Sequence, residues 1–298
     1  MNKIYDCFLF WKEFDALEIR LNELYGVVDK FIIVEFSQGH SGLHKPFYLK
    51  DNFAKYSDFA DKIELYSLDL KFKKRGPLYI GHQQRKILDE IIINIKPKSN
   101  DLILTSDSDE IVNSDVLNRY RNVSNCNLMF ELNMYHNYIN NFFGKWIRPR
   151  LVSFNNFKGF SYSYRDIFLV SNSKFRRIKW FPFMRVNPFF SATKLDVMLG
   201  TWVGFKGKKL DIVENAGWHF TKLYSIEDNY EHAQNTPHLE AVKDGISIEE
   251  MASRIEKNLT SYGKIAKGNL VKIDNSFPLY IQQNKNKFQK YIADMDLI

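Results

Sequence analysis

The stretch at residues 101–111, DLILTSDSDEI, places a strand-like segment directly before a cluster of acidic side chains. Residues 101–105 are mostly apolar, which predicts a strand that is buried on both faces, as in a parallel sheet. Asp107, Asp109 and Glu110 follow at once. In an open α/β sheet, ligands bind in the crevice beyond the carboxyl ends of the strands. The three carboxylates are therefore predicted at the ligand-binding edge of such a sheet.

The residues before this stretch alternate between strand and helix patterns. Apolar runs predict strands at 4–11, 30–36 and 63–68, and apolar residues spaced by three and four predict helices at 14–28 and 79–95. Glu18, Arg20 and Glu23 fall on the polar side of the first helix pattern. Strands that alternate with helices are typical of an open sheet. We therefore predict an α/β fold with a mostly parallel central sheet flanked by helices.

The second half of the chain shows a different pattern. Residues 127–220 contain short, aromatic-rich, strand-like segments separated by turn residues, and helix patterns return at 226–234 and 247–258. In the polar tail that follows, Phe288 and Tyr291 are candidates for docking onto the core. The sequence has no internal repeat and no clear linker. We therefore predict a single domain over residues 1–298 with an elaborated C-terminal half.

The composition indicates a globular chain with an excess of positive charge. The 298 residues are 45% hydrophobic, which is enough for a sizeable core. The formal net charge of +7 favours an anionic partner, such as a phosphorylated small molecule, nucleic acid or an acidic membrane surface. No apolar run approaches the roughly 20 residues that span a bilayer, and charges interrupt the N-terminal segment where a signal peptide would lie. Cys7 and Cys126 lie in apolar runs, as buried thiols of a reducing compartment do. We therefore expect a soluble, cytoplasmic protein.

The Asp-X-Asp arrangement of Asp107 and Asp109 suits a divalent cation. Mg²⁺ and Mn²⁺ prefer oxygen ligands and keep positions open for substrate phosphates. Two carboxylates this close also repel each other unless a cation or a donor neutralises them. We interpret the motif as the site of a cation held against a nucleotide diphosphate. The alternative is an acidic loop that leads into a helix, with Ser108 or Asp109 as its N-cap.

Two further segments combine polar side chains with glycine. In residues 214–222, ENAGWHFTK, Gly217 permits close approach of the backbone, and His219 is a candidate metal ligand or proton carrier. A polar loop, EFSQGHSG, follows the second predicted strand; with Glu35 and Ser37 it is a candidate to wrap a base and ribose, or is a simple connection. The sequence has no Walker-type P-loop, and no GxGxxG follows the strand.

Taken in order, these segments resemble glycosyltransferase family 17, which includes the enzymes that add bisecting N-acetylglucosamine. The matching segments are YDCFLF at 5–10, LEIRLNEL at 17–24, VDKFIIVE at 28–35, SG at 41–42, SDSDEI at 106–111 and GWH at 217–219. The resemblance implies a GT-A type fold, a divalent cation and inversion at the anomeric carbon. It also implies a nucleotide-sugar donor, which is UDP-N-acetylglucosamine in the characterised eukaryotic members. On this basis residues 1–125 would form the nucleotide-sugar-binding half, and residues 126–298 the acceptor-side half with the C-terminal helices.

The resemblance also suggests roles for particular residues. Asp107 and Asp109 match the Asp-X-Asp motif, Glu35 matches the acidic residue that ends the nucleotide-side strand, and His219 matches the histidine of Gly-Trp-His. Asp107, Asp109 and His219 are thus the expected ligands of Mn²⁺ or Mg²⁺. Within this set, we expect Asp109 on the metal and Asp107 nearer the ribose or a metal-bound water. Glu110 is expected to serve the following turn.

Two roles in an inverting transfer have only candidates. The candidates for positive charge at the phosphates are Lys45, Arg85 and Lys222. The alternative for each is an ordinary charged residue on the surface. A general base must take the proton of the acceptor hydroxyl, and this base is normally Asp or Glu. The candidates are Glu214, which lies just before Gly-Trp-His, followed by Asp166 and Asp196.

The resemblance also bears on partners and on the competing interpretations. The stem and membrane anchor of the Golgi members are missing, so we expect a glycan or lipid-linked glycan acceptor of the surface polysaccharide type. The basic charge adds an expected peripheral contact with anionic lipid at the inner face of a membrane, and we expect no nucleic acid partner. The alternatives are a metal-dependent phosphoesterase or nucleotide-sugar hydrolase, and a noncatalytic protein that binds anionic glycans or nucleic acid.

Overall fold

The computed structural model describes residues 1–72, 77–157, 159, 211–235, 245–263 and 265–294. With η for a 3₁₀ helix, its elements are β1 (Ile4–Leu9), α1 (Phe14–Leu24), β2 (Lys30–Phe36), α2 (Tyr48–Asp51), η1 (Phe53–Phe59), β3 (Ile63–Leu68), α3 (Pro77–Asn94), β4 (Leu102–Thr105), β5 (Glu110–Val112), α4 (Ser114–Arg119), β6 (Asn127–His136), β7 (Asn141–Ser153), η2 (Phe154–Asn156), β8 (Asp211–Val213), β9 (Gly217–Thr221), α7 (Ile226–Asn235), α8 (Ile248–Glu256), β10 (Asn269–Leu270), α9 (Leu279–Gln283) and η5 (Gln289–Tyr291). The strands predicted before residue 110 and the four predicted helices are all present.

The described strands form one ten-stranded sheet in the order β3-β2-β1-β4-β7-β6-β9-β5, with β10 paired to β7 and β8 to β6. The strands β3, β2, β1 and β4 run parallel, whereas β7 is antiparallel to both β4 and β6. The α/β class is confirmed, but the sheet is mixed: β6 also pairs in parallel with β8 and β9, whereas the pairs β4–β7, β6–β7, β5–β9 and β7–β10 are antiparallel. A connection of only four residues joins β6 to β7, and so short a connection forces antiparallel pairing.

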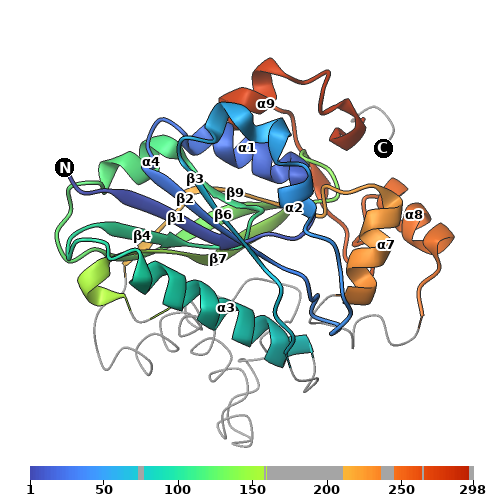
Figure 1. Cartoon of the computed structure of the whole chain (residues 1–298). Coiled ribbons are helices and arrows are strands. Elements are labelled where there is room, and N and C mark those ends of the chain that lie inside the picture. The colour runs from blue at the N-terminus through green and yellow to red at the C-terminus, as the bar shows by residue number, and fades with distance from the viewer. Residues whose placement is uncertain (73–76, 158, 160–210, 236–244, 264, 295–298) are drawn as a thin grey trace, which may run out of the picture.

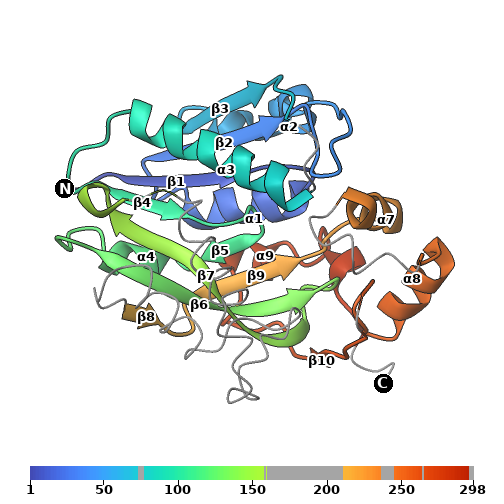
Figure 2. The ribbon, with the colours of Figure 1, turned by 90° about the horizontal axis from the view of Figure 1, so that it is seen from below.

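Helices cover both faces of the parallel strands. Figure 1 shows α1 on one face and α3 on the other, and Figure 2 shows α3 in front of the sheet. Successive residues of β2 point to opposite faces of the sheet. Phe31 belongs to the hydrophobic cluster that contains Leu17 of α1, and Ile32 belongs to the cluster that contains Leu88 of α3. All four side chains are fully buried. Burial on both faces explains why these strands read as continuous apolar runs.

The C-terminal segment packs on the same side as α1. Phe288 and Tyr291 are buried in one cluster with Ile19, and the Tyr291 hydroxyl donates to Asp15 of α1 (2.8 Å). Figure 1 shows α9 above α1. The predicted docking of the tail through its two aromatic residues is confirmed. In the part of the chain that the structure describes, no helix has both the length and the apolar character needed to cross a membrane.

The carboxyl ends of β1, β2 and β4 meet at one edge of the sheet, which is the edge predicted to bind ligand. The loop after β2 and the turn after β4 lie together there, since the charges of Arg85 and Asp107 both act on His40. The alternative with a helix beginning at Ser108 or Asp109 is wrong. Strand β5 follows the acidic residues, and α4 begins only at Ser114. Its N-cap is Asn113, whose side chain accepts a hydrogen bond from the Val116 backbone N–H.

Helix α7 from the second half of the chain completes this edge. The Lys12 ammonium, just after β1, pairs with Asp228 (2.8 Å) and Glu231 (2.5 Å) of α7. The Tyr48 hydroxyl from the β2 side donates to Glu231 as well (3.1 Å). Figure 1 shows α7 and α8 beside the loops that leave β1 and β2. The sheet itself continues across residue 125, because β4 pairs with β7. The predicted division into two halves stays a prediction.

Candidate active site

The turn at residues 106–109 joins β4 to β5, and Glu110 stabilises it. The Glu110 carboxylate accepts hydrogen bonds from the Asp107 backbone N–H (2.9 Å) and from the Trp146 indole. The Glu110 N–H donates back to the Asp107 carbonyl oxygen (3.1 Å). Burial and the charge of Asp107 raise the pKa of Glu110 to about 7. Glu110 thus serves the turn that precedes it, whereas the sequence-based expectation assigned it to the turn that follows.

Arg20 holds the backbone of the same turn from inside the protein. Its fully buried guanidinium forms a two-bond ion pair with Asp6 of β1 (2.5 and 2.7 Å). Nη1 donates to the carbonyl oxygens of Asp107 (2.9 Å) and Glu110 (2.8 Å), and Nη2 donates to the Ser106 hydroxyl (2.7 Å). The side chain therefore fixes the segment that carries the acidic motif.

The helix pattern predicts Arg20 on the solvent side of α1, and this prediction is wrong. Arg20 is 0% exposed because the Asp6 carboxylate and the carbonyl oxygens of the turn replace the water that would otherwise solvate the guanidinium. Buried charges persist only when they are paired and hydrogen-bonded. One signal was present in the sequence: Asp6 is a charged residue inside the apolar run of β1, which calls for a buried partner.

Asp109 and His219 form the closest pair of candidate metal ligands. Strands β5 and β9 pair with Glu110 opposite His219, which brings His219 Nε2 within 3.3 Å of Asp109 Oδ2. The ring centroids of His219 and Trp146 are 4.8 Å apart. Burial lowers the pKa of His219, but the charges of Asp109, Glu110 and Asp107 outweigh burial and leave that pKa raised. The acidic motif and Gly-Trp-His, which the sequence analysis placed in one site, are thus in direct contact through Asp109 and His219.

Gly217 makes this strand pairing possible. Its φ is +150°, and a Cβ built on it would lie 2.2 Å from the Ile111 carbonyl oxygen of β5. The predicted close approach of the backbone at Gly217 is therefore confirmed. Gly217→Ala is expected to force β9 away from β5 and to lower the free energy of unfolding by about 3 kcal/mol. Urea unfolding followed by tryptophan fluorescence measures this loss.

Gly144 provides a matched control for this substitution. It also has a positive φ, +125°, but a Cβ added there meets nothing within 4 Å. Gly144→Ala therefore carries the backbone strain without the collision, and we expect it to cost about 1 kcal/mol. Equal losses of stability in the two variants would show that contact with Ile111 does not matter.

Asp107 pairs with α3 instead of with His219. Its Oδ1 accepts a hydrogen bond from Arg85 Nη2 (3.1 Å), and 38% of its side chain is exposed. Among the described residues, no group of three or more His, Cys, Asp or Glu side chains is arranged to hold a metal ion. The expected ligand set is thus split into the Asp109–His219 pair and Asp107 with its arginine. The arginine offsets the repulsion between carboxylates at positions i and i+2.

The Asp109–His219 pair nevertheless fits a divalent cation that takes its other ligands from substrate. Mg²⁺ is commonly held by one or two carboxylates together with waters and substrate phosphates, so a complete protein cage is not required. One ring nitrogen of His219 faces Asp109, and the other, Nδ1, is buried without a hydrogen-bond partner in the described part of the chain. A cation shared with Asp109 would be coordinated by Nε2, since the lone pair of Nδ1 diverges from that carboxylate.

Lys45, a predicted phosphate ligand, places a buried positive charge near this edge. Its ammonium has no hydrogen-bond partner among the residues described, although it lies 5.1 Å from the centroid of the Tyr48 ring. Burial lowers the pKa of Lys45 to about 8, while Glu35, Glu13 and Glu231 act in the opposite direction. A buried ammonium without an anionic partner is costly. This lysine therefore favours an anionic ligand.

Lys222, a second predicted phosphate ligand, follows β9 and has a different environment. Its ammonium contacts His232 Nδ1 (2.7 Å) and the Tyr262 hydroxyl. Burial lowers the pKa of Lys222 to about 7, against the charges of Asp109 and Glu13. The Coulombic effect of Asp109 places this lysine near the candidate metal ligands, with aromatic residues around it.

Glu13 is a site residue that the sequence-based interpretation missed. Its carboxylate accepts hydrogen bonds from the Tyr224 hydroxyl (2.8 Å) and the Trp11 backbone N–H (3.0 Å). Burial and the nearby charge of Asp109 raise the pKa of Glu13. A signal was present, because the segment Trp11-Lys12-Glu13 leaves β1 at the same edge where the acidic motif leaves β4.

Glu35 and Ser37 of the loop after β2 have partners within the protein. Glu35 is fully buried, and its carboxylate accepts hydrogen bonds from the backbone N–H groups of Leu49 and Lys50 (both 2.9 Å) and from the Ser67 hydroxyl (2.6 Å). The Ser37 hydroxyl donates to Asp69 (2.5 Å). Glu35 therefore anchors the start of α2, and direct contact of either residue with a nucleotide stays a prediction.

Of the three candidate bases, Glu214 lies in the described part of the chain. Glu214 is exposed in the turn between β8 and β9. It comes before His219 in the sequence, whereas Lys222 comes after it. Its neighbour Asn215 contacts Lys145. Asp166 and Asp196 lie outside the described residues. The assignment of a base therefore stays a prediction.

A protein-family model matches the first part of the chain. The model of glycosyltransferase family 17 matches residues 1–179, which contain β1 to β7 and the acidic motif but not His219. No curated protein matches the chain. The family match favours sugar transfer over phosphoester hydrolysis and over noncatalytic binding. Because it covers more than half of the chain, the protein belongs to glycosyltransferase family 17 and is a glycosyltransferase.

Proposed function

We propose that this glycosyltransferase has a GT-A type fold, depends on Mn²⁺ or Mg²⁺, and transfers N-acetylglucosamine from UDP-N-acetylglucosamine with inversion. The proposed acceptor is a glycan or a lipid-linked glycan. The observation that carries the proposal is the contact of Asp109 with His219 at the carboxyl edge of the sheet. Carboxylate and imidazole there, with lysines nearby, match what a cation and a diphosphate require.

Each group of this site has a proposed task. Asp109 and His219 hold the cation, which when bound supplies Lewis-acid stabilisation of the departing diphosphate. Lys45 and Lys222 bind the phosphate oxygens as point charges. Asp107, oriented by Arg85, contacts the ribose or a water of the cation shell. Charge stabilisation of the leaving group is thus shared among side chains on several elements, which fixes the donor in one orientation.

The general base is proposed to be Glu13 ahead of Glu214, Asp166 and Asp196. An effective base has a pKa near the working pH and lies at the reaction centre. Glu13 has a raised pKa and lies in the electrostatic range of Asp109. Glu214 is exposed in the β8–β9 turn. Glu13 can thus serve as the base if its bond to Tyr224 gives way to the acceptor hydroxyl.

The proposed location is the cytoplasm, with peripheral contact at the inner face of an anionic membrane. The net charge of +7 supports this, because basic surfaces are attracted to anionic lipid within about one Debye length. Sedimentation with vesicles of phosphatidylcholine alone or with phosphatidylserine tests the contact. Binding that is equal for both compositions would remove the electrostatic basis of this proposal.

Calorimetric titration with UDP-, GDP- and CMP-sugars, with and without Mn²⁺, tests the donor and the cation together. We expect binding of UDP-N-acetylglucosamine that is at least tenfold tighter with Mn²⁺ than with EDTA, since the cation links the diphosphate to Asp109. Specific binding also raises the melting temperature by mass action. Equal affinities for UDP- and GDP-sugars would contradict the donor assignment, and affinity independent of the cation would contradict the metal role.

The pH dependence of UDP affinity tests Lys45. Since its pKa in the free protein is lowered to about 8 by burial, Lys45 loses its charge as the pH rises through this value. A bound diphosphate favours the charged form, so Lys45 alone is expected to contribute a fall in affinity of about tenfold between about pH 7 and 9. Lys222, whose pKa is lowered to about 7, also loses charge over this range, so Lys45→Met should bind UDP weakly throughout and show a fall about tenfold smaller than that of the unaltered protein. Lys50→Met, an exposed lysine on α2, is the control and should retain it.

A further inference from the structure

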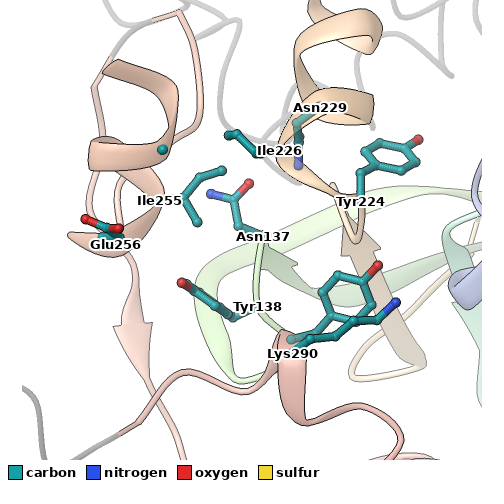
Figure 3. Close-up of a pocket in the computed structure, with 10 residues that line it drawn as sticks. Asn137, Tyr138, Tyr224, Ile226, Asn229, Ile255, Glu256 and Lys290 are labelled. Carbon is teal, nitrogen blue, oxygen red and sulfur yellow. The ribbon is translucent and has the colours of Figure 1, made fainter. Parts of the chain in front are cut away.

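A cavity lies between α7, α8 and the C-terminal segment, and the proposed chemistry does not use it. Its volume is about 210 Å³, and its wall includes Asn137, Tyr138, Tyr224, Asn229, Glu256 and Lys290. Figure 3 shows the Asn137 amide in the middle of these residues, between Ile255 and Tyr224. The volume is below the roughly 300–1,000 Å³ of sites for drug-sized ligands, which suits a ligand the size of one monosaccharide.

Two amides of the wall have unused hydrogen-bonding capacity. Asn137 and Asn229 are 4% and 1% exposed, and the Oδ1 atom of each is buried and lacks a hydrogen bond of good geometry in the described part of the chain, although the neighbouring His136 side chain interacts with that of Asn137. Asn137 Nδ2 donates to the Leu259 carbonyl oxygen (3.1 Å), and Asn229 Nδ2 donates to the Lys222 carbonyl oxygen (3.5 Å). A buried carbonyl oxygen without a donor costs about 1–3 kcal/mol. The terminal torsion of asparagine is broad, so a small rotation turns each oxygen toward a ligand hydroxyl.

The rest of the wall suits a neutral polyol better than an anion. Tyr138, Tyr224 and Tyr291 supply aromatic surface. The two charged side chains offer no net positive charge, because Glu256 is acidic and the Lys290 ammonium already pairs with Asp15 (3.2 Å). A sugar combines many hydroxyls with apolar C–H surface. Its hydroxyls can donate to the asparagine oxygens, and its C–H surface can pack against the tyrosine rings.

The cavity shares a wall with the candidate active site. Tyr224 lines the cavity while its hydroxyl donates to Glu13, the carboxylate near Asp109 (2.8 Å). The Asn137 N–H donates to the Thr221 carbonyl oxygen (3.0 Å), only two residues after His219 along β9. A ligand in the cavity would therefore lie next to the reaction centre, on the far side of the Tyr224 ring.

We propose that this cavity binds one saccharide unit of the acceptor, a unit adjacent to the one that receives the sugar. This inference rests on the proposed function, and it specifies the substrate class: the acceptor has at least two sugar units. Asn137 and Asn229 accept hydrogen bonds from its hydroxyls, and Tyr138 covers its apolar face. The active site alone binds the donor, so the two kinds of ligand are recognised independently.

Saturation-transfer NMR on the full chain tests the proposal without any turnover. The probes are cellobiose, maltose, lactose and N,N′-diacetylchitobiose at equal millimolar concentrations. We expect transfer to the ring protons of at least one probe, with a Kd at least tenfold weaker in Tyr138→Ala and in Asn229→Ala. Lys257→Ala, an exposed neighbour that does not line the cavity, is the matched control and should bind as the unaltered protein does.

UDP binding with Mn²⁺, measured on the same samples, separates the two proposals. We expect it to be unchanged in Tyr138→Ala, which would also show that this variant is folded. Absence of transfer to every probe, or equal transfer in the unaltered protein and both cavity variants, would overturn the saccharide site even when UDP binds. Transfer that is lost in the cavity variants while UDP fails to bind would support the site and contradict the donor assignment.

Discussion

Arg20→Met is expected to lower the free energy of unfolding by about 3–5 kcal/mol, the loss typical of removing one partner from a buried ion pair. The substitution leaves the Asp6 carboxylate at 0% exposure without its counter-charge. It also removes the donor to the carbonyl oxygens of Asp107 and Glu110. Urea unfolding measures the loss. Arg121→Met is the control, because that arginine is also buried but pairs with the half-buried Asp29, away from the acidic turn.

The double variant Asp6→Leu, Arg20→Met separates stability from positioning. Replacing both members of a buried ion pair by apolar residues restores much of the stability, since no unpaired charge remains. The turn at residues 106–109 still lacks its donor, so we expect Mn²⁺-dependent UDP affinity to stay at least tenfold reduced. Full recovery of affinity together with stability would contradict a positioning role for Arg20. Arg121→Met should leave UDP affinity unchanged.

Local patterns predict the parallel half of this fold well. In β2, residues that alternate between two buried faces read as one apolar run, and the spacing of Leu17, Leu21 and Leu24 gives α1 its buried side. Because parallel strands end at one edge, the order of elements alone places the acidic motif beside the loop after β2. The antiparallel pairing of β7 with β4 is not local, since it depends on which strand edge remains free after β1 to β4 have assembled.

The site itself is only partly readable from sequence. Asp109 and His219 are 110 residues apart along the chain, and family resemblance rather than any local pattern suggests that they meet. Arg20 and Glu13 escape prediction because a charged residue in an amphipathic helix, or just before one, ordinarily faces water. Partners elsewhere explain why Arg20 is buried and Glu13 half-buried: Asp6 for Arg20 and Tyr224 for Glu13. Tertiary partners, not helix patterns, decide which charged residues enter the site.

Asp109→Asn is expected to lower kcat/KM for sugar transfer about a thousandfold. The substitution keeps the shape of the side chain but removes the charge that, with His219, would hold the cation, and loss of about 4 kcal/mol of transition-state stabilisation corresponds to this factor. The same variant should lose the tightening of UDP affinity by Mn²⁺. The direct contact with His219 suggests a second readout, a lowered pKa of that imidazole in the NMR titration of the variant.

Glu13→Gln should show the complementary behaviour, which distinguishes a base from a metal ligand. If Glu13 takes the proton of the acceptor hydroxyl, the amide lowers kcat at least about a hundredfold while Mn²⁺-dependent UDP affinity is retained. Glutamine still accepts the hydrogen bond of Tyr224, so the local packing is kept. Glu214→Gln, in the exposed β8–β9 turn, is the matched carboxylate control and should transfer sugar at the normal rate. A large loss in Glu214→Gln with normal activity in Glu13→Gln would return the base assignment to the acceptor-side half.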